Sequence, residues 1–185
     1  MNQLTQFRDD LLQMDTAAGV ASEPGPAART LLDGALNYCA GKMSLIGPQS
    51  ALDNLRAGQP AAHSYFQFAL ARQAAVYMAG LDGEVTAAYL YDYEATPEDI
   101  IFGKLDPTPI VHIIVRVRRR TEALQALGDA LNQALARVYA ERTGQPVGPQ
   151  MLDLQYVDDA ETRQGRGYAS LLSAFNLRPL LVWER

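Results

Sequence analysis

Pro109-Ile-Val-His-Ile-Ile-Val-Arg-Val-Arg-Arg-Arg120 is the stretch of sequence that decides the fold. Its β-branched residues follow a period of two, which predicts a strand. The odd positions of this strand are valine or isoleucine throughout, whereas the even positions mix isoleucine with His112, Arg116 and Arg118. One face of the strand is therefore expected in the core, and the other face is expected to carry polar side chains.

An amphipathic helix follows this strand directly. Thr121 is expected to cap its first turn, and Gly144 is expected to end it. Between these two residues, apolar side chains recur at steps of three and four. They are Leu124, Leu127, Leu131, Leu135 and Val138. Such a stripe predicts that the helix packs on the apolar face of the sheet and leaves the polar face uncovered.

The remaining segments predict further helices and strands around this pair. Helices are expected over about residues 3–14, 26–38, 50–56, 60–79 and 96–103, and strands over 84–94, 151–157 and 180–183. This order predicts an α+β fold, with a mostly antiparallel sheet of about four strands and helices packed on one face. A permuted ferredoxin-like arrangement is the specific expectation. Residues 1–58 are expected to form a helical N-terminal extension or cap, and residues 59–185 the α+β sandwich domain, as one structural unit.

The helix over 60–79 is apolar around nearly its whole circumference, apart from a narrow strip that includes His63. Such a helix is either central to the core or lies in a subunit contact. In the strand over 84–94, the odd positions place Tyr89, Tyr91 and Tyr93 on one face, which suits the edge of a core or an interface. These two features make a homo-oligomer the expected state.

Composition excludes several other classes of function. The net charge is −5, and residues 1–80 carry 5 basic and 6 acidic side chains while residues 81–185 carry 11 and 15. Neither part is a basic surface, so nucleic-acid binding is not expected. The single cysteine, Cys39, suits a reducing compartment. With two histidines and no Cys-x-x-Cys, no metal site is expected. No membrane segment or signal peptide is recognised, so the expected location is the cytoplasm.

The polar face of the sheet is the first candidate functional surface. In the strand over 151–157, Asp153 and Gln155 alternate with apolar residues that are expected to face the helices. The same sheet surface is therefore expected to collect five polar side chains: His112, Arg116, Arg118, Asp153 and Gln155. One interpretation is a polar pocket for a small anionic ligand, built around a histidine that changes charge near physiological pH. The other is a sheet face covered by a second subunit.

A second candidate is the segment Arg163-Gln-Gly-Arg-Gly-Tyr-Ala169. It follows a strand, and exposed amides at a helix start there would cradle a pyrophosphate. This segment resembles the acyl-CoA-binding loop of the GCN5-related N-acetyltransferases, whose motif is Gln/Arg-x-x-Gly-x-Gly/Ala. Gln164, Gly167 and Ala169 match that motif. The resemblance implies an acyl-CoA site formed by Gln164, Gly165, Arg166, Gly167 and Ala169. The alternative interpretation is a loop over 158–166 followed by an ordinary helix.

No nucleophile elbow, metal-binding helix motif or dinucleotide fingerprint occurs in the sequence, so no catalytic residue and no cofactor is assigned. The leading hypothesis is a non-catalytic, homo-oligomeric interaction or small-ligand-binding module that uses the polar sheet face. The alternative is an N-acyltransferase-like protein that binds acyl-CoA through Gln164–Ala169. Whether the chain is an enzyme stays open.

Overall fold

The structure, a computed structural model, describes residues 23–91, 110–144, 150–174 and 179–185. Its helices are α2 (Pro24–Lys42), α3 (Pro48–Arg56), α4 (Pro60–Leu81), α6 (Glu122–Thr143), α7 (Asp159–Gln164) and α8 (Ala169–Leu172). Its strands are β1 (Val85–Leu90), β2 (Val111–Val117), β3 (Leu152–Asp158) and β4 (Leu180–Glu184). The helices expected over 3–14 and 96–103, and Tyr93, lie outside the described residues. The fold is α+β, as predicted.

The four strands form one mixed sheet in the order β3-β2-β1-β4. β1 pairs antiparallel with both β2 and β4, whereas β2 and β3 are parallel. The mostly antiparallel sheet expected from the sequence is therefore corrected to a mixed one. The reason is that α6 is long enough to return the chain to the starting end of β2, so β3 runs beside β2 in the same direction. This arrangement does not confirm a ferredoxin-like fold.

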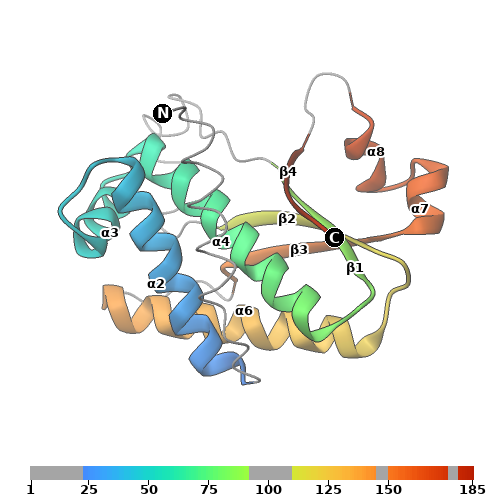
Figure 1. Ribbon diagram of the computed structural model, residues 1–185, viewed down its shortest axis with the longest axis horizontal. Coiled ribbons are helices and arrows are strands. Elements are labelled where there is room, and N and C mark those ends of the chain that lie inside the picture. The colour runs from blue at the N-terminus through green and yellow to red at the C-terminus, as the bar shows by residue number, and fades with distance from the viewer. Residues whose placement is uncertain (1–22, 92–109, 145–149, 175–178) are drawn as a thin grey trace.

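The main core lies between the sheet and the helices α2, α3, α4 and α6 (Figure 1). The valine and isoleucine residues at the odd positions of β2 all belong to it, as predicted. α4 contacts α2 and the strands β1, β2 and β4, so most of its apolar surface is buried within the chain, whereas Tyr65 and Leu81 are exposed. Of the two explanations for an all-round apolar helix, the central core helix is the observed one. His63 is only 3% exposed, so the polar strip on which the sequence places it is buried at this residue.

His63 and Cys39 both belong to this interior. The Nε2 atom of His63 lies 3.0 Å from the carbonyl oxygen of Leu55. Burial holds the pKa of His63 below its ordinary value, despite an opposing contribution from that hydrogen bond. Burial also raises the pKa of the Cys39 thiol to about 11. Both side chains therefore remain neutral parts of the core.

The opposite face of the sheet carries α7 and α8 (Figure 1). Ala169 of α8 forms a second, small hydrophobic cluster with Ile114 of β2 and Val157 of β3. Tyr89 of β1 and Tyr91, which directly follows this strand, pack against this cluster. The expectation that helices occupy one face only therefore fails for these two short helices. α8 covers the middle of the face that was expected to be polar, through Ala169.

A β-bulge in β1 changes which of its residues share a face. The pairing with β2 shifts register between Val85 and Ala87. Val85 consequently lies in the main core with Ala88 and Leu90, while Tyr89 packs on the opposite face. The prediction that all odd positions of this strand share one face was wrong at its first residue, because a bulge adds one residue to the alternation.

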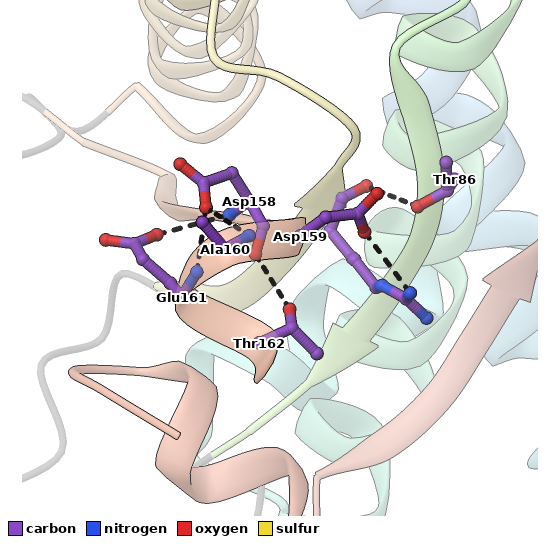
Figure 2. A network of polar contacts seen from close by, with 7 residues as sticks. Thr86, Asp158, Asp159, Ala160, Glu161 and Thr162 are labelled. Atoms are coloured by element: carbon purple, nitrogen blue, oxygen red, sulfur yellow. Dashed lines mark hydrogen bonds and ion pairs between the residues drawn. The ribbon is translucent and has the colours of Figure 1, made fainter. Parts of the chain in front are cut away.

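Local signals place the helix ends with mixed success. Thr121 accepts a hydrogen bond from the N–H of Leu124 at 3.1 Å, and Gly144 takes the left-handed conformation at the end of α6; both were predicted. The helix expected over 50–56 begins earlier, at Pro48. The segment after β3 is helical rather than a loop, because Asp158 and Glu161 form a capping box that starts α7 (Figure 2).

No helix in the described part of the chain is both long and apolar enough to cross a membrane. Residues of α2 and α3 are buried in the same hydrophobic cluster as α4 and the sheet. The division of the chain at residue 58 stays a prediction.

Candidate functional site

The carboxylate of Asp153 is the centre of a polar cluster on the sheet face opposite the long helices. Its Oδ2 atom accepts hydrogen bonds from the hydroxyl of Tyr91 and from Nδ1 of His112, both at 2.9 Å. Its Oδ1 atom accepts a hydrogen bond from Nε2 of Gln155 at 2.6 Å. We call these four residues the Asp153 cluster. Three of the five residues predicted for the polar sheet face are brought together in it.

The hydrogen bonds decide the charge of this cluster. Burial is the largest single influence on Asp153 and raises its pKa, but hydrogen bonds from His112, Tyr91 and Gln155 together outweigh it and lower the pKa. Burial, followed by the hydrogen bond to Asp153, raises the pKa of Tyr91 above its ordinary range. At neutral pH Asp153 is therefore an ionised acceptor, and Tyr91 is a neutral donor.

An ionised carboxylate beside Nδ1 also fixes the orientation of the His112 ring. Because the carboxylate only accepts hydrogen bonds, Nδ1 carries the proton and Nε2 is the atom left for other partners. No hydrogen bond to Nε2 of His112 is found among the described residues. The ring also packs against Tyr91, with the ring centroids 5.4 Å apart. The cluster therefore presents one oriented imidazole nitrogen, which accepts a hydrogen bond when neutral and donates one when protonated.

Arg116 and Arg118 do not join this cluster. Arg116 pairs with Asp159 of α7, with Nη2 and Oδ1 3.3 Å apart (Figure 2). Ile114, which is fully buried, lies between His112 and Arg116 along β2. Arg118 lies beyond the end of the strand and is exposed. The predicted continuous polar face is thus two polar groups separated by the small hydrophobic cluster.

A pocket of about 330 Å³ adjoins the Asp153 cluster along β3. It is lined by Arg120, Gln125, Leu154, Gln155, Tyr156, Val157, Glu161, Gly167 and Tyr168. Gln155 belongs to both the pocket and the cluster. Tyr168 also joins the two, because its ring centroid lies 5.6 Å from that of Tyr91. The pocket and the Asp153 cluster are therefore contiguous.

The predicted acyl-CoA loop borders this pocket through one residue, Gly167. Gln164 is the last residue of α7, and Gly165 and Gly167 both take left-handed conformations. The N–H groups of Gly165 and Arg166 donate to carbonyl groups of α7, and the N–H of Ala169 donates to the carbonyl group of Arg166. These amides are thus engaged locally, and α8, which follows, is four residues long. The loop lines the pocket through Gly167. Its N–H groups that donate to local carbonyl groups are not available to bind a phosphate.

Tyr91 and Tyr168 are the site residues that sequence reasoning missed. The alternation of the strand predicted over 84–94 placed Tyr91 on a face with other tyrosines. Alternation does not tell which strands are neighbours, so it could not predict that Tyr91 lies near Asp153. Tyr168 comes from a loop, where no periodicity predicts direction. In the sheet, β2 lies between β1 and β3, so Tyr91 reaches Asp153 across β2.

Comparison with known proteins gives no assignment: no family model, curated protein or solved structure matches this chain. Within the described residues, no group of three or more histidine, cysteine or acidic side chains is placed to hold a metal ion.

Proposed function

We propose that this protein is a non-catalytic binding module that recognises a small ligand at the Asp153 cluster and the adjoining pocket. The observation that carries the proposal is that Asp153 accepts three hydrogen bonds, one of which holds the His112 ring in one orientation. The side chain of His112 is 29% exposed. An oriented, accessible imidazole beside a pocket is a recognition group for a polar ligand. With Asp153 ionised, an anionic ligand is bound when His112 is protonated.

We expect a small carboxylate to bind at Nε2 of His112, because the hydrogen bond from Nδ1 to Asp153 leaves this atom for other partners. The measurement is a thermal-shift screen of small mono- and dicarboxylates. A ligand present at about 100 times its Kd stabilises the protein by about 2.7 kcal/mol. The variant His112→Gln should lose this stabilisation, whereas Arg118→Gln, on an exposed residue outside the cluster, should keep it.

The absence of any stabilising carboxylate, or equal effects of His112→Gln and Arg118→Gln, would remove the proposal. The same measurement with acetyl-CoA tests the acyl-CoA alternative. Stabilisation by acetyl-CoA that disappears in the variant Gly167→Trp would favour the alternative over the carboxylate site.

We also propose that the protein is a homo-oligomer and that it is cytoplasmic. The oligomer is supported by strand β4, an edge strand on which Leu180 is 39% and Leu181 45% exposed. Exposed apolar edge strands are generally covered by another chain or blunted by charge. We expect light scattering at micromolar concentration to give a mass above that of one chain, and Leu181→Lys to reduce it. A monomer for the unmodified chain contradicts this part.

A further inference from the structure

Within the part of the chain that the structure describes, the outer edge of β3 bears unpaired backbone groups. Val111 donates its N–H to the carbonyl oxygen of Met151 at 2.8 Å, and the pairing of Val111 with Leu152 continues in parallel register along the strand. In a parallel ladder of this register, the N–H and C=O groups of Asp153 and Gln155 point toward β2. The backbone groups of the alternate residues point outward, away from the sheet, because β3 is an edge strand.

Both ends of this edge are closed by side chains. At one end, the N–H of Leu152 donates to Oδ1 of Asn132 at 2.9 Å. At the other end, the N–H of Asp158 donates to Oε2 of Glu161 at 3.2 Å. Between them, the outward N–H groups of Leu154 and Tyr156 have no hydrogen-bond partner among the described residues. The open edge is therefore a short window with alternating donors and acceptors.

The pocket described above lies along this window. Gln125 of α6 lines it from the helical layer, and Tyr168 lines it from the α7–α8 connection on the other face of the sheet. Its two charged residues, Arg120 and Glu161, form an ion pair with each other. The lining is therefore close to neutral, and its polar groups are two side-chain amides, two phenols and the backbone of β3.

We propose that this window binds an uncharged peptide segment in extended conformation, which adds to the sheet beside β3. An extended chain presents N–H and C=O groups on one edge at every second residue, about 7 Å apart. That spacing matches the outward groups of Leu154 and Tyr156. Strand addition at an exposed sheet edge is a recurrent mode of peptide recognition, in which the backbone provides affinity and flanking pockets provide specificity. Gln125 and Tyr168 are the specificity groups, on opposite sides of the added strand.

A second copy of this chain fits the window less well than a peptide does. Only the N–H groups of Leu154 and Tyr156 are available on this edge. Stable protein–protein interfaces bury about 1,200–2,000 Å², which is more than so short a stretch of strand provides. A pocket of about 330 Å³ lies at the small end of the range for ligand sites, which is about 300–1,000 Å³. The neutral lining disfavours a charged segment, because burial would leave its charge unpaired. The proposal uses the pocket that the small-ligand proposal also uses, but its support, the outward backbone groups of β3, does not depend on His112.

The test uses a displayed library of random peptides about nine residues long, selected on the full-length chain. Gln125→Trp places an indole in the pocket, and Gln133→Trp is the matched control, because both glutamines are exposed residues of α6. Selected peptides should bind the unmodified chain and Gln133→Trp equally, and Gln125→Trp at least about tenfold more weakly, measured by fluorescence anisotropy. His112→Gln should bind them normally, which separates this site from the Asp153 cluster.

Amide hydrogen exchange, measured by NMR, gives a second readout that does not depend on a variant. A bound peptide should slow exchange at Leu154 and Tyr156, while Asp153 and Gln155, already bonded to β2, should change little. Failure to select any peptide, equal binding to Gln125→Trp, or exchange at Leu154 and Tyr156 unchanged by the peptide would each overturn the proposal. If exchange at these two amides instead slows when the concentration of the protein is raised without any peptide, the partner of this edge is a second copy of the chain.

Discussion

Replacing Asn132 with leucine is expected to lower the free energy of unfolding by about 2–5 kcal/mol, because two buried N–H groups lose their acceptor. Asn132 is 9% exposed, and its Oδ1 atom accepts hydrogen bonds from the N–H groups of Met151 at 2.8 Å and Leu152 at 2.9 Å. Asn132 lies on α6 and thus joins the helical layer to the start of β3. Leucine has a similar size, so the loss comes from the amides and not from a cavity.

The measurement is chemical denaturation of the variant beside Gln133→Leu, an exposed neighbour on the same helix. The control is expected to change stability by no more than about 0.5 kcal/mol. Hydrogen exchange should also accelerate locally at the amides of Met151 and Leu152 in Asn132→Leu. A loss below about 1 kcal/mol, with unchanged exchange at these amides, would mean that water replaces the asparagine and that Asn132 does not anchor β3.

Gly128→Ala is expected to destabilise the protein by about 1–3 kcal/mol, although alanine is the better helix former. A Cβ atom at Gly128 would meet the hydroxyl oxygen of Tyr156 and Cδ1 of Leu154, the latter 2.8 Å away. The Tyr156 hydroxyl itself donates a hydrogen bond to the carbonyl oxygen of Leu124 at 3.3 Å. The ring therefore cannot move away without losing that bond, and α6 must shift from the sheet.

A double-mutant cycle with Tyr156→Phe tests the cause. Removing the hydroxyl group also removes the closest contact, so the double variant should be more stable than the two single changes predict by about 1 kcal/mol or more. Gly41→Ala in α2 is the control, because nothing lies within 4 Å of its Cβ position, and it should be neutral or stabilising. Strict additivity in the cycle would show that the approach of α6 to β3 at Gly128 is not limiting.

These two positions explain why the site lies beside β3. Gly128 allows α6 to approach Tyr156 closely, and Asn132 holds the first residues of the strand. Both act on the helix-facing side of β3. The opposite side of the same strand carries Asp153 and Gln155, so the position of the Asp153 cluster depends on the helix that packs behind it.

The sequence by itself determined the local structure around β2 and α6. A period of two fixes the faces of β2, and the apolar stripe, Thr121 and Gly144 fix the limits of α6, because these signals act within a few residues. The same alternation placed His112, Asp153 and Gln155 on one face, and the structure brings them together. These predictions needed no knowledge of which strands are neighbours.

Only the tertiary structure decided the strand order, the parallel pairing of β3 and the division of the polar face by α8. Tyr91 donates to Asp153 from 62 residues away, and no local pattern encodes a contact of that range. The bulge in β1 and the two glycine conformations before α8 likewise depend on packing. The physical reason is that hydrophobic period and helix capping are properties of one segment. Strand pairing and the closing of a sheet edge depend on contacts between segments that are distant in the chain.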